Sequence, residues 1–279
     1  MPALFLGHGS PMNTLQLNGF TQAWRSLGEQ LPTPRAVLVV SAHWFFGATA
    51  VTAMPRPRTI HDFYGFPPDL FSFEYPASGA PEVAEEIAEA VKPIWCGLDR
   101  DQWGLDHGTW SVLAHLRPQA DVPVVQLSIN ALKALSYHVE LGAKLAALRD
   151  RGIMVIGSGN VVHNLGQLQR NEPNGAFDWA ERFDDAVVQQ LEEDPAAILK
   201  VTEHADYPLA APTPDHFIPL LYMAGIAAAS GEAMEPLIRG YSMGSLSMTC
   251  YGIGSELSCR DEQGAATVPR GVPADQTNI

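Results

Sequence analysis

The chain contains little cysteine and has no pattern of paired thiols. Its 279 residues include only Cys96, Cys250 and Cys259, and no CxxC pair occurs among them. An odd, sparse set of this kind disfavours a disulfide framework or a thiolate zinc site, and it is typical of a reducing compartment. We therefore expect a cytoplasmic protein whose chemistry does not depend on thiolates.

Basic residues and long apolar runs are also scarce. Lys and Arg number 17 against 31 Asp and Glu, which gives a formal net charge of −14. This balance argues against nonspecific binding to nucleic acid or to an anionic membrane, since both need Lys and Arg. We see no signal peptide, and no apolar run reaches the length that spans a bilayer. We expect small-molecule partners, with no nucleic acid and no membrane, and the oligomeric state stays open.

The chain does contain an alternation of strand-like and helix-like segments. Short apolar runs flanked by Gly or Pro predict buried strands at 3–6, 36–40, 122–128 and 153–156, with a less regular one at 245–253. Apolar residues at helical spacing predict helices at 82–91, 136–151, 179–191 and 217–229. This order predicts a single α/β domain over residues 1–257, with a mostly parallel central sheet flanked by helices. We expect the polar tail, residues 258–279, to be disordered.

Histidines follow several of the predicted strands. His8, His43 and His163 come after strand-like runs, and His216 precedes a predicted helix. Because the carboxyl ends of parallel strands form the edge where ligands bind, these imidazoles can converge on one metal ion. Taken singly, each can equally be a buried histidine that bonds a nearby carbonyl. An all-histidine site suits zinc, copper, iron or nickel and disfavours magnesium and calcium.

Further candidates have two interpretations each. His107 lies between two tryptophans and is either a packed polar residue or a hydrogen-bond donor to a substrate oxygen or to dioxygen. His61 and Phe66 belong to an aromatic segment that is either a lid or a packed surface loop. His163 can be a ligand or a general base, and Asp215 a helix N-cap or a carboxylate ligand.

Several of these segments together resemble the DODA-type (4,5-DOPA dioxygenase extradiol) ring-opening dioxygenases of the class III, protocatechuate 4,5-dioxygenase-like superfamily. The segments that carry the resemblance are 2–12 (PALFLGHGSPM), 41–44 (SAHW), 61–63 (HDF), 106–108 (DHG), 158–164 (SGNVVHN) and 212–216 (PTPDH). The resemblance runs in chain order to about residue 256, and the polar tail lies outside it. It implies an oxidoreductase that opens a DOPA-like catechol with O2 to a muconic semialdehyde.

The resemblance also implies roles for individual residues. His8, His43, His163 and His216 match metal-site positions, and His163 and His107 match positions that act on substrate and dioxygen. In the wider superfamily the third ligand is often a glutamate, and the matching residue here is His216, which leaves the preferred metal open. We expect one divalent ion, with Fe2+ as the catalytic metal and Zn2+ as a tight occupant, because zinc has no accessible redox change.

The remaining expectations concern the substrate-binding residues and the alternative functions. We expect His61 and Phe66 to bind the substrate, with the apolar side chains of their segment covering its ring and excluding water. The alternatives are a zinc-dependent hydrolase, a tetrapyrrole metal chelatase, or a non-catalytic protein that binds metal or catechol. Catechol-dependent oxygen uptake distinguishes the dioxygenase from all of them.

Overall fold

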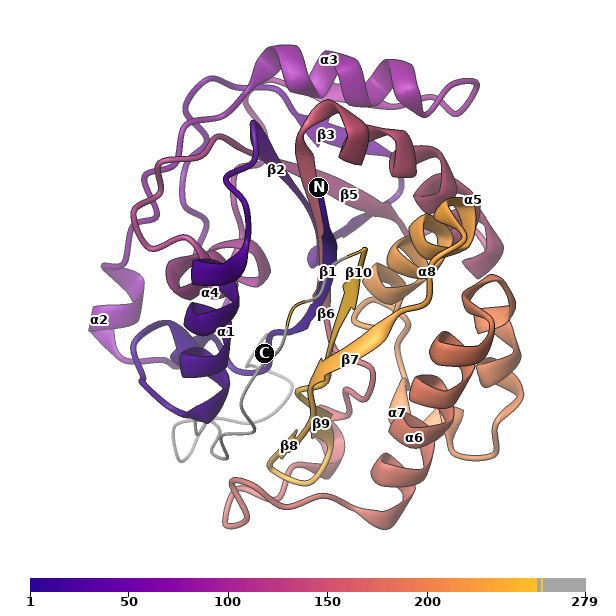
Figure 1. The fold of residues 1–279 in the computed structure, drawn as a ribbon. Coiled ribbons are helices and arrows are strands. Elements are labelled where there is room, and N and C mark those ends of the chain that lie inside the picture. The colour runs from indigo at the N-terminus through magenta and orange to yellow at the C-terminus, as the bar shows by residue number, and fades with distance from the viewer. Residues whose placement is uncertain (255–256, 258–279) are drawn as a thin grey trace.

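A sheet of eight strands runs through the middle of the molecule (Figure 1). The computed structural model describes residues 1–254 and residue 257. In spatial order the strands are β4 (Gly97–Asp99), β3 (Ala50–Thr52), β5 (Val124–Asn130), β2 (Ala36–Phe46), β6 (Ile153–Gly159), β1 (Ala3–Gly7), β10 (Cys250–Ile253) and β7 (Glu235–Ile238). The four central strands β5, β2, β6 and β1 are mutually parallel, which confirms the predicted fold class.

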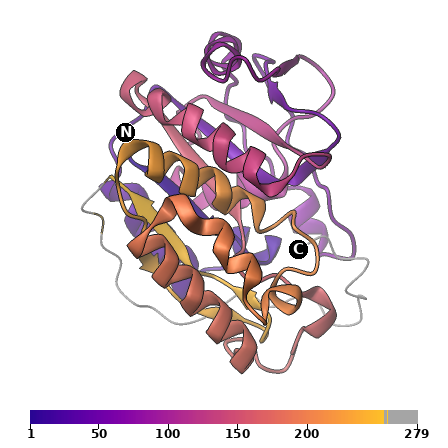
Figure 2. The ribbon, with the colours of Figure 1, turned by 90° about the vertical axis from the view of Figure 1, so that its right-hand side faces the viewer.

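Helices cover both faces of this sheet. On one face lie α1 (Gly19–Gln30) and α4 (His107–Leu116), and on the other α3 (Pro81–Ala90), α5 (Leu135–Leu145), α6 (Asp178–Glu193) and α8 (Ile218–Ser230). Figure 2 looks onto α5, α8 and α6, with the sheet behind them. Because both faces are covered, every residue of β1, β5 and β6 is buried, which explains why β1 and the first four residues of β6 read as continuous apolar runs.

Shorter elements connect these layers. They are α2 (Pro68–Phe71), α7 (Tyr207–Ala210), the strand pair β8 (Tyr241–Ser242) and β9 (Leu246–Ser247), and the 3-10 turns η1 (Pro11–Thr14), η2 (Ala146–Arg151), η3 (Leu165–Gln167) and η4 (Pro195–Glu203). The helix predicted over 136–151 consists of α5 followed by η2, and it ends at Gly152, whose φ of 79° suits glycine.

The structure differs from the sequence-based prediction at several places, among them the strands β3, β4 and β7 at and next to the sheet edges, which were not predicted. Strand β2 continues to Phe46, with an irregular register between Val40 and Phe45. The run 245–253 divides into β9 and β10, because it turns between two sheets. Helices α1 and α4 were not predicted, and α4 is buried around most of its circumference, so its sequence lacks a clear apolar stripe.

Within residues 1–254, no helix combines the length and the apolar character that a membrane crossing requires. The predicted disordered tail, residues 258–279, lies outside the described residues, and so does Cys259.

Candidate metal centre

Five histidines from five separate segments meet at the carboxyl ends of β1, β2 and β6. They are His8 directly after β1, His43 near the end of β2, His107 at the start of α4, His163 after β6 and His216 before α8. The ring centroids of His43 and His107 are 3.8 Å apart, those of His163 and His216 3.5 Å, and those of His8 and His216 5.2 Å. The imidazoles are almost fully buried: His8, His107, His163 and His216 are at most 6% exposed as residues, and the His43 side chain is 1% exposed.

The donor atoms within this cluster are spaced as ligands of one ion would be. The Nε2 atoms of His8 and His43 lie 3.3 Å apart, and two nitrogen ligands of a tetrahedral zinc ion lie about 3.4 Å apart. Ligand atoms of His8, His43 and His107 lie within 4.8 Å of one another, as do those of His163, Asp215 and His216.

A ring nitrogen without a hydrogen-bond partner also supports a cation within the histidine cluster. His216 Nε2 is buried, and it has no hydrogen-bond partner among the residues that the structure describes. A buried nitrogen without a hydrogen-bond partner destabilises the protein unless an ion or another polar group binds it. The residues present therefore fit a divalent metal ion that accepts nitrogen ligands.

Ser158 at the end of β6 fixes the tautomer of His8. The Ser158 hydroxyl donates to the Gly108 carbonyl at 2.5 Å, so its oxygen accepts the hydrogen bond from His8 Nδ1 at 2.9 Å. Backbone bonds hold the same residue in place, because His8 N–H donates to Gly159 and the Asn13 amide donates to the His8 carbonyl. With the proton on Nδ1, the lone pair of His8 Nε2 faces His43.

Asp62 lies between His43 and His107. Its Oδ1 accepts the backbone N–H of His107 at 3.0 Å and lies 2.9 Å from His107 Nδ1, although that ring N–H does not point straight at the oxygen. Its Oδ2 lies 3.6 Å from His43 Nδ1. Burial raises the pKa of Asp62, but the neighbouring imidazoles and the bonds from His107 outweigh burial and hold that pKa below its usual range. The carboxylate is therefore ionised at neutral pH.

A buried polar network locks the start of α4 to the sheet. Asp106 caps this helix, because its Oδ1 accepts the Thr109 N–H at 3.2 Å, and the same oxygen accepts the Ser41 hydroxyl at 2.7 Å. Gln126 of β5 donates to the other oxygen. Burial and the nearby charge of Asp62 raise the pKa of Asp106 to about 6. The network connects β2, β5 and α4 and so places His107 against the end of β2.

Two glycines let the segments of the cluster approach one another. A Cβ at Gly108 would lie 2.4 Å from Ser41 Oγ and 2.8 Å from His43 Cδ2. A Cβ at Gly159 would lie 2.2 Å from the His216 carbonyl oxygen. Neither approach leaves room for a side chain, so both glycines are required by the packing around the histidines.

His163 and His216 form a stacked pair on another side of the cluster. Their rings are nearly parallel, at an interplanar angle of 4°. Asp215 accepts a hydrogen bond from His216 Nδ1, and it does not cap α8, which begins at Ile218 after Phe217. Burial raises the pKa of Asp215, but the charge and hydrogen bond of His216 outweigh burial and lower the pKa well below its usual range.

Burial also determines the protonation of the imidazoles. Desolvation, together with repulsion from the neighbouring histidines, lowers the pKa of His8 and of His43 well below 6.5. Both rings are neutral at neutral pH, which is the state that binds a metal ion.

The predicted aromatic segment packs against His107 through the ring of Phe63. His61 Nε2 bonds the Phe73 carbonyl at 2.9 Å, which is not a contact with the histidine cluster. Phe66 packs on Phe63 at 5.2 Å, and the Phe63 ring lies 5.5 Å from that of His107. Sequence reasoning did not single out Phe63, which it included only among the apolar side chains of the segment 61–66.

The structure also reveals partners that the sequence did not single out. Asp62 and Ser158 both lie within motifs of the resemblance, yet only their contacts with imidazoles, an ion pair for Asp62 and a hydrogen bond for Ser158, show what they do. Their position within those motifs was the one signal that pointed to them.

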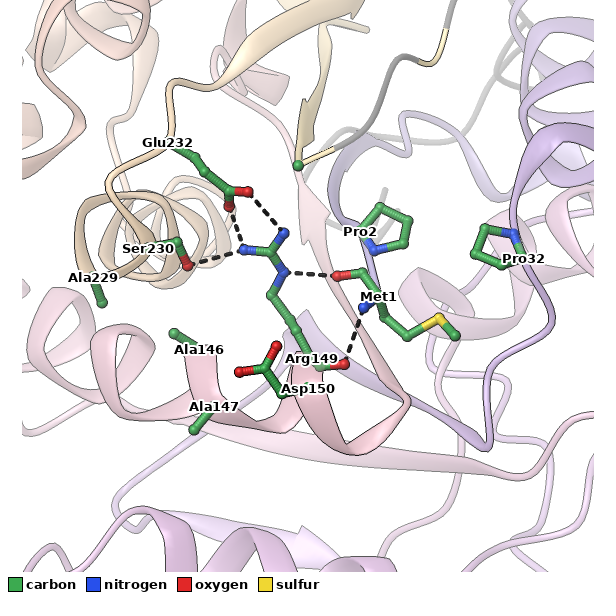
Figure 3. A pocket seen from close by; sticks show the side chains of 11 residues that line it. Met1, Pro2, Pro32, Ala146, Ala147, Arg149, Asp150, Ala229, Ser230 and Glu232 are labelled. Carbon is green, nitrogen blue, oxygen red and sulfur yellow. Dashed lines mark hydrogen bonds and ion pairs between the residues drawn. The ribbon is translucent and has the colours of Figure 1, made fainter.

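A separate cavity of about 710 Å³ lies at the opposite edge of the sheet, near the start of β1 (Figure 3). Its charged groups pair with one another, because the Arg149 guanidinium bonds Glu232, Ser230 and the Met1 carbonyl. None of the five clustered histidines lines this cavity, so its size does not make it the candidate site.

Comparisons with known proteins identify the family to which this chain is related. Residues 3–252 match the family model described as the catalytic LigB subunit of aromatic ring-opening dioxygenase. The 4,5-DOPA dioxygenase extradiol of Escherichia coli (strain K12) is 47% identical over 263 residues, 91% of this chain and 95% of that protein. The protein of the same name from Beta vulgaris is 33% identical over 257 residues, 88% of this chain and 94% of that one. A crystal structure of an uncharacterized Escherichia coli K12 protein has a TM-score of 0.79 at 43% identity and covers 91% of this chain and 100% of its own.

Proposed function

The chain belongs to the family of catalytic LigB subunits of aromatic ring-opening dioxygenases, and from that premise we propose that it opens a catechol ring at a metal ion held by the histidine cluster. The enzyme class is extradiol dioxygenase. The observation that carries the proposal is the convergence of five buried imidazoles, with two Nε2 atoms 3.3 Å apart and a third buried without a partner among the described residues.

The proposed metal ligands are His8, His43, His163 and His216. A bound ion would supply coordination of the catechol oxygens and of dioxygen, together with a path for electrons between them. Zinc has no accessible redox change, so iron(II) is the proposed working metal. Zinc binds such nitrogen donors more tightly than iron(II) and is the expected competitor.

The chain's own residues move protons and exclude water. His163, stacked on His216, is the proposed base that takes a proton from a catechol hydroxyl, because a neutral imidazole has one ring nitrogen with a free lone pair. His107, on the side of His8 and His43, is the proposed hydrogen-bond donor to the oxygen on which charge develops.

His61 and Phe66 remain the proposed substrate-binding residues. In this arrangement Phe66 acts through Phe63, whose ring lies against His107 and forms an apolar wall that excludes water. The relatives' names point to a DOPA-like catechol as substrate, which ring opening would convert to a muconic semialdehyde. A cytoplasmic location stays a prediction.

Oxygen uptake by the reconstituted protein tests the function. The metal-free protein is loaded anaerobically with iron(II), with zinc in a parallel sample, and mixed with a panel of catechols while dissolved oxygen and visible absorbance are recorded. We expect catechol-dependent oxygen uptake and a yellow semialdehyde with iron alone. Full activity with zinc and none with iron would overturn the choice of metal. Absence of oxygen uptake with every catechol would overturn the proposed reaction and favour a hydrolase, a chelatase or a binding protein.

A further inference from the structure

We infer that Ser158, Asp62 and Asp215 are positioning residues, each of which holds the Nδ1 of one imidazole so that its Nε2 faces the metal ion. The inference rests on the proposed function only in taking a divalent ion as the occupant of the cluster. The contacts in question are made by residues that are not themselves proposed metal ligands.

Each of three imidazoles has its own anchor. Nδ1 of His8 donates to Ser158, and Nδ1 of His216 donates to Asp215. The third pair is an electrostatic contact and not a hydrogen bond, because His43 Nδ1 lies 3.6 Å from Asp62 Oδ2.

In each of these pairs the anchor lies at Nδ1, on the far side of the ring from Nε2. In His8 and His216 the outward nitrogen therefore carries the proton and the inward one carries the lone pair, since neutral imidazole has one of each. At Nε2, His8 and His43 approach to 3.3 Å, a spacing that an ion bound to both would satisfy, and His216 has no partner within the described chain. Metal-binding histidines commonly use such outer partners to fix ring orientation and basicity.

The two carboxylates also balance charge. A divalent ion among neutral imidazoles leaves positive charge in a buried place, which is costly unless negative charge lies near. The Asp62 and Asp215 side chains are only 13% and 21% exposed, and both face the cluster from its rim. Ser158 fixes orientation without charge, so we expect it to contribute less to metal affinity than either carboxylate.

Asp62 has a second contact that separates its effect from that of Asp215. Its Oδ1 holds both the backbone N–H and the ring of His107, which is the proposed hydrogen-bond donor to substrate oxygen. Removal of the charge at Asp62 should therefore lower kcat even when the metal site is saturated. Removal of the charge at Asp215 should act mainly on metal binding, through His216.

The test measures metal affinity in the full-length, metal-free protein. Zinc is titrated against a chelator, and the visible absorption of bound cobalt(II) reports the ligand field. The variants are Asp62→Asn, Asp215→Asn and Ser158→Ala. Asp206→Asn is the matched control, because Asp206 also lies beside a histidine, at 3.9 Å from His204 Nδ1, but away from the cluster.

We expect zinc affinity about 10- to 100-fold weaker in both Asn variants, with an altered cobalt spectrum. The loss in Ser158→Ala should be smaller, and the control should match the wild type. At saturating iron, Asp62→Asn should lower kcat and shift its pH profile, whereas Asp215→Asn should recover most of the wild-type kcat.

Asp62→Glu and Asp215→Glu distinguish a loss of charge from a folding defect, because each keeps the carboxylate but moves it. They should bind zinc more tightly than the Asn variants, and the unfolding midpoints of metal-free variants and wild type should agree. Wild-type zinc affinity in both Asn variants would overturn the inference, as would Glu variants no better than Asn. Loss of affinity in an enzyme that opens no catechol would leave the inference standing and overturn the proposed function instead.

Discussion

Substitution of Gly108 by alanine should weaken metal binding while leaving the fold nearly as stable as before. Gly108 is the second residue of α4, and a Cβ there would lie 2.4 Å from Ser41 Oγ and 2.8 Å from His43 Cδ2. Ordinary contacts of carbon atoms are about 3.5–4.0 Å, so His43 must move by roughly 1 Å. Ser41 cannot give way freely, because its hydroxyl bonds Asp106 at 2.7 Å.

Two opposing effects determine the stability of this variant. Overpacking of a buried site costs about 1–3 kcal/mol. Replacement of glycine by alanine in a helix returns about 1 kcal/mol. We therefore expect the free energy of unfolding of the metal-free protein to fall by about 0–2 kcal/mol, which leaves it folded.

The same shift should be far more damaging to function. A displacement of about 1 Å at a reacting centre can reduce rate by about 100-fold, and disturbance of a ligand's surroundings lowers metal affinity by about 10- to 100-fold. The assay combines zinc titration, urea unfolding of the metal-free protein and oxygen uptake after iron loading. Gly47→Ala is the control, since its Cβ would meet only the end of the Leu132 side chain at 3.3 Å, and that side chain is exposed. If folded Gly108→Ala binds zinc within about twofold of the wild type, the close approach does not position His43 and the reasoning is wrong.

Three further predictions use other parts of the structure. His8→Ala should empty the metal site, whereas His163→Ala should reduce turnover sharply; metal analysis of both purified variants shows whether His163 is also a ligand. Asp184→Ala should cost about 3–5 kcal/mol in urea unfolding, because this buried carboxylate accepts bonds from two buried hydroxyls and an arginine, and a loss below about 1 kcal/mol would contradict that. The metal-free protein should lose stability as pH falls below about 6.5, because His8 and His43 have lowered pKa values and the unfolded chain binds protons that the native state does not, at up to about 1.4 kcal/mol per pH unit for each ring. Asp106, with a pKa of about 6, binds a proton in the native state and offsets part of this loss, and equal urea midpoints at about pH 7.5 and about pH 5.5 would refute the prediction.

The predicted architecture came from patterns that are local in the sequence. Apolar runs such as 36–40 and 153–156 identified strands β2 and β6, because a strand buried on both faces needs consecutive apolar residues. Helix α4 escaped prediction for the opposite reason, since it packs on most sides and mixes His, Thr and Ser with its apolar residues. Its burial depends on a polar network with β2 and β5 that no local period records.

The histidines themselves were predictable, because strand ends of a parallel sheet share one edge. That argument brought His8, His43 and His163 to the same place, His216 was expected to join them, and the structure adds His107 to the same cluster. The argument from strand ends gave no account of which nitrogen of each ring faces the centre of the cluster. That choice depends on Ser158 and on carboxylates from distant segments.

The sequence by itself determined the fold class, the family and the residue type that gathers at the strand ends, because periodicity and motifs are properties of neighbouring residues. The tertiary structure alone decided the partners of each imidazole, such as Asp62 beside His43 and Asp215 beside His216. The orientation of a buried ring follows from hydrogen bonds and contacts with groups far away along the chain, and those distances exist only once the sheet has formed.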